Sequence, residues 1–240
     1  MAASRSSTFA TFATFGLAIF DLDGTVVDSL PDIAAALNRT LQGAGREPLP
    51  QAQIRSYVGD GAARLVQRAL PDEFPVDAIA RLTADFRIQY AAGLCVETRP
   101  YPGIEPVLQR FASAMPLAIF TNKPSELARP LLRQLQLDHY FTHVIGDGDG
   151  YARKPAPDAG RWLLERHGGD PGRALVVGDG VPDMRFAHAL GARAAAVSWG
   201  YSERDRLAAE HPTWTVDRPE ELVEIALASP DIVLASPLDR

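Results

Sequence analysis

The hydrophobic pattern divides the chain into an isolated strand, a helical stretch, and a region in which strands and helices alternate. The isolated strand is the apolar run from Leu17 to Phe20, which stops abruptly at polar turn residues, as buried strands do. Between Asp28 and Arg99 the apolar spacing predicts helices with hardly a strand among them, over residues 31–41, 51–58, 61–70 and 76–91.

From Tyr101 onward, strands alternate with helices. The pattern predicts strands at residues 116–120, 142–145, 174–177, 193–198 and 214–216. It predicts helices at residues 103–114, 125–136, 157–167, 182–190 and 219–228. Such alternation is typical of a parallel, doubly wound sheet, in which ligands bind beyond the carboxyl ends of the strands. The predicted fold class is therefore α/β, a Rossmann-like core with an inserted all-helical cap.

The predicted domain boundaries lie where the helical stretch meets the alternating strands and helices. We assign residues 13–27 and 100–230 to the core and residues 28–99 to the cap, and we expect loose termini at 1–12 and 231–240. Residues 1–20 contain no acidic residue, which is also typical of targeting peptides. The apolar run is too short for a membrane span and leads directly into the first strand, so we expect a cytoplasmic protein without membrane contact.

Composition narrows the possible partners. A net charge of −6 and a pI near 5.4, without a basic cluster, argue against binding to nucleic acid. An anionic ligand would need cations placed locally. The single cysteine, Cys95, rules out an internal disulfide and a cysteine metal cage, and it fits a reducing compartment.

Two acids follow the first strand directly. Asp21 and Asp23 are one residue apart and precede Gly24 and Thr25. Alternate residues of an extended segment point the same way, so both carboxylates can address one reactive centre, and Gly24 lets the backbone turn sharply. Taken alone, an ordinary Asp-rich turn is the other interpretation of this stretch.

Three later strands also run into polar segments. These segments are Thr121-Asn122-Lys123, Arg153-Lys154-Pro155 and Gly178-Asp179-Gly180-Val181-Pro182-Asp183. With the Asp21 segment they resemble, in order, the four motifs of the haloacid dehalogenase superfamily, and the resemblance covers residues 17 to 200. It implies phosphoryl-transfer chemistry in the core and an inserted cap above it.

The resemblance implies a catalytic role for five motif residues. Asp21 would attack phosphorus and form an aspartyl-phosphate. Asp23 would protonate the leaving alkoxide and then deprotonate the attacking water. Thr121 and Asn122 would hydrogen-bond the phosphoryl oxygens, and Lys154 would offset their charge.

A magnesium ion (Mg2+) is implied by the same motifs. Asp21, Asp179 and the main-chain carbonyl of Asp23 would hold it, and Asp183 would bind a metal water or orient Lys154. Carboxylates that converge on a phosphate dianion repel it, so their charges demand a divalent cation in any case.

Lysine usage supports the role of Lys154 independently. Among the 24 cationic residues only Lys123 and Lys154 are lysines, and both lie in motif segments. A compact ammonium retained in an arginine-rich chain indicates a site where the planar guanidinium does not fit. For Lys123, a solvated helix start or a role in shaping the loop is the other interpretation.

Within the superfamily, an all-helical insertion after the first motif resembles the phosphoglycolate phosphatase and β-phosphoglucomutase branch. Four short sequence segments resemble the phosphoglycolate phosphatases more closely. They are Ser29 with Pro31-Asp32, Val58-Gly59-Asp60-Gly61, Arg99-Pro100-Tyr101-Pro102-Gly103 and Trp199-Gly200-Tyr201. Asp60, Ala156 and Gly180 depart from the family pattern of Asn, His and Ser. An acid at 60 disfavours a carboxylated substrate unless a cation offsets it. Arg64, about one turn further on, is the candidate, although it also fits a solvated helix arginine.

The predicted function is a Mg2+-dependent phosphatase that acts on a small phosphorylated metabolite, 2-phosphoglycolate or a close relative. Gly24, Asn122 and Arg64 complete the predicted substrate-binding set. A phosphomutase shares the whole catalytic set and is the second candidate. A noncatalytic binding protein of the same fold would be expected to have lost Asp21, Asp23 or Lys154. The sequence leaves open whether the protein is a monomer or a homodimer.

Overall fold

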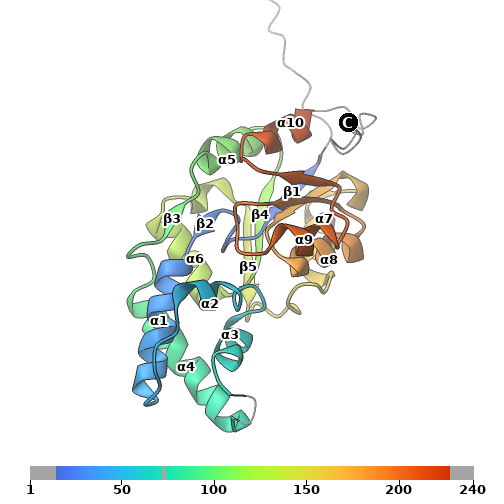
Figure 1. Ribbon diagram of the computed structural model, residues 1–240. Coiled ribbons are helices and arrows are strands. Elements are labelled where there is room, and N and C mark those ends of the chain that lie inside the picture. The colour runs from blue at the N-terminus through green and yellow to red at the C-terminus, as the bar shows by residue number, and fades with distance from the viewer. Residues whose placement is uncertain (1–14, 72–73, 228–240) are drawn as a thin grey trace, which may run out of the picture.

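A parallel six-stranded sheet forms the centre of the computed structural model, which describes residues 15–71 and 74–227 (Figure 1). The strand order is β5-β4-β1-β6-β7-β8. These strands are β1 (Leu17–Phe20), β4 (Leu117–Pro124), β5 (His143–Asp147), β6 (Ala174–Gly178), β7 (Arg193–Val197) and β8 (Trp214–Val216). β1 pairs in parallel with β4 on one side and β6 on the other, which confirms the predicted doubly wound sheet.

The central strand is buried on both faces, which explains its continuous apolar run. Leu17 and Ile19 belong to one hydrophobic cluster, and Ala18 and Phe20 belong to the other, because successive side chains point to opposite faces. On one face the core includes side chains of α5 (Ile104–Ala112), α6 (Ser125–Gln134) and α10 (Glu221–Leu227). On the other face it includes side chains of α7 (Asp158–His167) and α8 (Val181–Leu190).

Four helices lie between Asp28 and Arg99 in the sequence and gather beyond the carboxyl end of β1 (Figure 1). We call them the cap helices: α1 (Leu30–Gly43), α2 (Gln51–Arg55), α3 (Ala62–Arg68) and α4 (Val76–Ala92). Ile33, Leu37 and Leu41 of α1 are buried at the spacing of one helix face, as the pattern predicts. The domain boundaries at residues 28 and 99 stay a prediction.

Two short strands connect the cap helices to the sheet. β2 (Val27–Asp28) and β3 (Arg99–Pro100) pair antiparallel. The buried Asp32 carboxylate in the first turn of α1 accepts hydrogen bonds from the main-chain N–H groups of Val96, Glu97 and Thr98. Both ends of the cap segment are thereby tied together where they meet the core.

The structure differs from the predicted elements in three places. The pair β2 and β3 was not predicted, because two-residue strands have no periodicity, and the short helix α9 (Arg204–Ala208) was not predicted either. β4 continues to Pro124, so the motif residues Thr121 to Lys123 lie within a strand instead of after it. The predicted termini at 1–12 and 231–240 lie outside the described residues. Within the described residues, no helix is long and apolar enough to cross a membrane.

Candidate active site

The predicted motif residues meet at the carboxyl edge of the sheet. Asp21 and Asp23 directly follow β1, Thr121 lies in β4, and Asp179 directly follows β6. Lys154 comes from the loop between β5 and α7. The sheet brings them together because β1 lies between β4 and β6, so the polar residues at the ends of three parallel strands share one edge.

Lys154 forms the ionic centre of the site. Its Nζ lies 2.6 Å from Oδ1 of Asp21 and 2.6 Å from Oδ1 of Asp183. Burial by itself would lower the pKa of Lys154, but the Asp183 and Asp21 carboxylates outweigh this effect and raise its pKa above the ordinary value. Lys154 therefore remains a cation beside the proposed nucleophile, where it can stabilise a phosphoryl group but cannot act as a base.

A carboxylate cluster lies next to this ion pair. Asp21, Asp179 and Asp183 each offer an oxygen within 4.8 Å of the others. Burial raises the pKa of Asp179 to about 8, and the charges of Asp21 and Asp183 contribute to the rise. Burial likewise raises the pKa of Asp183 to about 7, against the opposing effect of Lys154. Hard oxygen ligands crowded in this way fit Mg2+, whose charge would relieve their repulsion.

Asp179 is held in place by its neighbours. Thr25 Oγ1 donates to Asp179 Oδ1 at 3.0 Å, and the Tyr201 main-chain N–H donates to Oδ2 at 2.7 Å. A Cβ atom on Gly24 or on Gly200 would overlap the Asp179 carboxylate, and Gly24 also has a positive φ of 85°. Gly24 is thus required both by the turn and by the close approach of Asp179. Its predicted phosphate contact stays a prediction.

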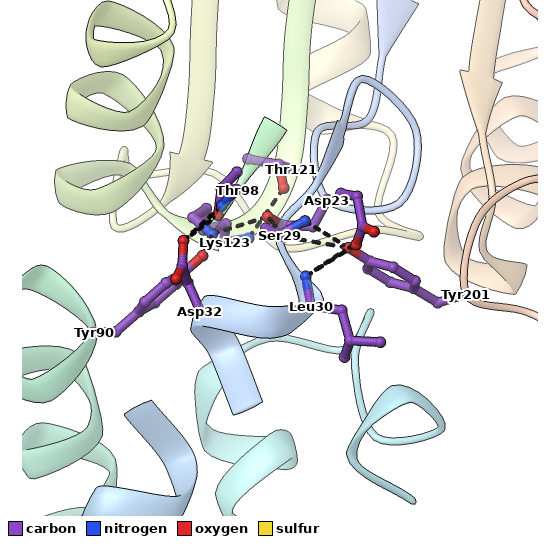
Figure 2. A network of polar contacts seen from close by, with 10 residues as sticks. Asp23, Ser29, Leu30, Asp32, Tyr90, Thr98, Thr121, Lys123 and Tyr201 are labelled. Atoms are coloured by element: carbon purple, nitrogen blue, oxygen red, sulfur yellow. Dashed lines mark hydrogen bonds and ion pairs between the residues drawn. The ribbon is translucent and has the colours of Figure 1, made fainter. Parts of the chain in front are cut away.

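The Asp23 carboxylate contacts the Lys123 ammonium and the Ser29 hydroxyl (Figure 2). Its Oδ1 accepts a hydrogen bond from Lys123 Nζ at 2.9 Å and another from Ser29 Oγ at 2.5 Å. The Lys123 side chain is only 3% exposed. A solvated helix start is therefore the wrong interpretation of Lys123, because the continuation of β4 carries its ammonium into the site.

Two tyrosines belong to the same network (Figure 2). Lys123 Nζ donates to the Tyr90 hydroxyl at 2.5 Å, and Tyr90 comes from the cap helix α4. The Tyr201 hydroxyl accepts the main-chain N–H groups of Ser29 and Leu30 at 2.8 and 3.0 Å. Sequence reasoning missed Tyr90, because one tyrosine on an apolar helix face carries no signal beyond packing. Tyr201 was noted only within Trp199-Gly200-Tyr201, a segment that resembles the phosphoglycolate phosphatases.

Asn122 connects the site to the cap. Its Oδ1 accepts the Lys154 main-chain N–H at 2.9 Å, and its Nδ2 donates to the Gly59 carbonyl at 3.0 Å. This side chain therefore positions the Lys154 loop, and its predicted phosphate contact stays a prediction. Thr121 Oγ1 accepts the Lys123 N–H at 3.2 Å, so its own hydroxyl proton can still be donated to a ligand.

Arg64 does not line the cavity that borders Asp21 and Asp23. Its Nη1 donates to Gln67 Oε1 at 2.8 Å, and it borders a neighbouring cavity of about 670 Å³. The cation that pairs with Asp60 is Arg68, at 2.5 Å, and the predicted substrate contact of Arg64 stays a prediction. Gly61 turns the chain with a φ of 88° before α3 begins, so Asp60 is outside the helix and one-turn spacing does not apply.

A small cavity of about 50 Å³ borders Asp21 and Asp23, and we call it the carboxylate cavity. Its core side is lined by Asp21, Asp23, Thr121, Asn122, Lys123 and Pro124. Its cap side is largely apolar and includes Ile33, Val58, Leu65, Phe86 and Tyr90. The cap helices therefore cover this part of the site. A second cavity, of about 810 Å³, borders Asp21 and Asp23 together with Asp179 and Asp183.

Comparison with known proteins agrees with this geometry. The chain is 36% identical over 224 residues to phosphoglycolate phosphatase 1 of Pseudomonas aeruginosa, covering 91% of this chain and 82% of that protein. It is 38% identical over 213 residues to the phosphoglycolate phosphatase of Neisseria meningitidis, covering 85% of this chain and 91% of that protein.

Solved structures and a family comparison lead to the same class. The crystal structure of a predicted phosphoglycolate phosphatase from Haemophilus somnus superposes with a TM-score of 0.83 at 31% identity, covering 88% of this chain and 98% of that one. The sequence model of the haloacid dehalogenase-like hydrolases matches residues 15–191. The chain therefore belongs to the haloacid dehalogenase-like hydrolases, as its four strand-end motifs indicate.

Proposed function

We propose that this protein is a Mg2+-dependent phosphatase that hydrolyses a small phosphomonoester, with 2-phosphoglycolate or a close relative as its substrate. One observation carries the proposal: Lys154 pairs with Asp21 beside a buried carboxylate cluster, under a small enclosed cavity. The phosphoglycolate phosphatase names of the relatives support the choice of substrate.

In the first half of the reaction, Asp21 attacks phosphorus and the ester oxygen leaves. Asp23 donates a proton to that oxygen, so an alcohol departs instead of an alkoxide. The phosphoryl group is then bonded to Asp21 as an aspartyl-phosphate. Lys154 and the Thr121 hydroxyl are placed to stabilise the charge on the transferred oxygens.

In the second half, water attacks the aspartyl-phosphate. Asp23, now deprotonated, takes a proton from this water, and inorganic phosphate leaves as Asp21 is restored. Asp21, Asp179 and Asp183 would hold Mg2+, which when bound offsets the negative charge of the phosphoryl group.

The cap helices would control access to this chemistry. Asn122 donates to the Gly59 carbonyl, and Arg55 Nε of α2 donates to the Tyr201 carbonyl at 3.3 Å, so cap and core are in contact around the cavity. Opening of these contacts would admit substrate. Their closure excludes bulk water from the reacting groups.

A phosphomutase is the second candidate, because it would use the same catalytic residues. The relatives of this chain are named phosphoglycolate phosphatases, which favours the phosphatase over the mutase.

Phosphate release by the purified protein tests the proposal. The assay uses Mg2+, with and without a chelator, on 2-phosphoglycolate, sugar phosphates, nucleotides, pyrophosphate and β-glucose 1-phosphate. We expect fast, chelator-sensitive release from 2-phosphoglycolate. Conversion of β-glucose 1-phosphate to glucose 6-phosphate without phosphate release would identify a mutase instead. Slow release from every compound would mean that the substrate is a phosphomonoester outside this panel.

A further inference from the structure

We propose that Lys123 and Tyr90 bind the second anionic group of the substrate, a carboxylate at the end away from the transferred phosphate. This inference rests on the proposed phosphatase function and deepens it. The substrate carboxylate would bind in the carboxylate cavity, which Asp21 and Asp23 line. Lys123 from the core and Tyr90 from the cap would contact it.

Lys123 has the donor capacity for this role. An ammonium group has three N–H donors, and the contacts of Lys123 with Asp23 and Tyr90 use two of them. Its side chain is 3% exposed and belongs to the lining of the carboxylate cavity. A buried cation with a remaining donor is a strong binding group for an anion, because little water competes for it.

The rest of the cavity leaves a carboxylate no other cation. Among the described residues that line it, Lys123 is the one cation, whereas Asp21 and Asp23 are acids and most of the cap side is apolar. An unpaired carboxylate against Phe86 or Leu65 would lose its hydration without compensation. Lys123 is therefore the charged partner that this cavity offers to a substrate carboxylate.

Tyr90 completes the site. Its hydroxyl accepts from Lys123, so its own proton can be donated to a carboxylate oxygen. Lys123 Nζ also lies 4.3 Å from the centroid of the Tyr90 ring, a cation–π contact that fixes the ammonium. Because Tyr90 belongs to α4 and Lys123 to β4, the pair forms only where the cap meets the core, so recognition of the carboxylate favours closure (Figure 2).

The test compares two substrates that differ in one group. 2-Phosphoglycolate carries a carboxylate, whereas 2-hydroxyethyl phosphate carries a neutral CH2OH on the same skeleton. For Lys123→Met we expect kcat/KM to fall about 100-fold more for 2-phosphoglycolate than for 2-hydroxyethyl phosphate, with the difference mainly in KM. For Tyr90→Phe we expect a differential loss of about 5-fold to 20-fold.

Two variants serve as matched controls. Arg39→Met removes a cation that bonds Gln89 on the outside of the cap, and Tyr140→Phe removes a hydroxyl that bonds Glu105. Neither should change the ratio of kcat/KM values for the two substrates. Thermal unfolding followed by circular dichroism checks each variant, and Tyr90→Phe decides the matter if Lys123→Met does not fold.

The possible failures are distinct. Equal losses on both substrates would overturn the inference, because Lys123 would then act only through Asp23. A preference of the unaltered enzyme for 2-hydroxyethyl phosphate would overturn it as well. If the unaltered enzyme released phosphate from neither compound, the proposed function would itself be wrong, and the carboxylate site with it.

Discussion

The main-chain N–H of Tyr201 donates to Asp179 Oδ2 at 2.7 Å, and the hydroxyl of the same tyrosine accepts two main-chain N–H groups at the start of α1. One residue therefore connects the carboxylate cluster to the first cap helix. The buried hydroxyl also donates to Asp28 Oδ1 at 3.0 Å. A single loop after β7 thus contributes both to the orientation of a proposed metal ligand and to the attachment of the cap.

Tyr201→Phe should destabilise the protein by about 1–3 kcal/mol, because it removes the acceptor of the Ser29 N–H and leaves the Leu30 N–H with only its 3.3 Å contact to Asp28 Oδ1. Urea unfolding measures the loss. Tyr140→Phe is the matched control, since it removes an exposed hydroxyl and should stay within about 0.5 kcal/mol of the unaltered protein. Equal effects of the two substitutions would contradict the capping role of Tyr201.

Asp21→Asn should abolish turnover and preserve the fold. The amide has nearly the same shape but cannot attack phosphorus, so we expect kcat to fall by at least about 10⁴-fold. The substitution removes a charge that repels Asp179 and Asp183 and also weakens the pair with Lys154, which keeps Asp183 as its partner, so the metal-free variant should still fold. Phosphate release and thermal unfolding measure the two effects, and full activity of the variant would refute the proposed nucleophile.

Stabilisation by Mg2+ should increase from pH 6 to pH 8. The pKa of Asp179 is raised to about 8 in the folded, metal-free protein, above the ordinary value of 3.8, so the folded state binds more protons than the unfolded state between these values. The contribution of Asp179 to stability is therefore present at low pH and is lost as the pH rises toward 8.

Metal binding has the opposite pH dependence, because the carboxylates must lose their protons to become ligands. The rise in Tm on adding Mg2+ should thus be larger at pH 8 than at pH 6. Differential scanning calorimetry at both pH values measures it. Asp21→Asn provides a comparison with a weakened ligand cluster, and a Mg2+ effect independent of pH would contradict the proposed site.

Arg64→Ala tests the one substrate contact in which sequence and structure diverge. The sequence predicts a large rise in KM for 2-phosphoglycolate. The structure places the Arg64 guanidinium against Gln67, outside the carboxylate cavity, so we expect KM to change by less than about 2-fold. Steady-state kinetics measures KM for 2-phosphoglycolate in Arg64→Ala and in Lys123→Met. A large rise in KM for Arg64→Ala, but not for Lys123→Met, would support the sequence prediction instead.

The architecture and the grouping of the motif residues follow from the sequence alone. The apolar run before Asp21 and the alternation after Tyr101 predicted the parallel sheet, because the periods of strands and helices are local properties. Strand-end motifs predicted the grouping of Asp21, Lys154, Asp179 and Asp183, because parallel strands present their carboxyl ends at one edge.

The cation that faces the cavity is set by tertiary contacts. Lys123 and Tyr90 are 33 residues apart, on a strand and on a cap helix, and no local spacing relates them. Arg64 had the correct helical spacing from Asp60, but the turn at Gly61 removed Asp60 from the helix. Contacts between segments distant in sequence depend on how helices pack across the whole chain, and a one-dimensional pattern does not contain that information.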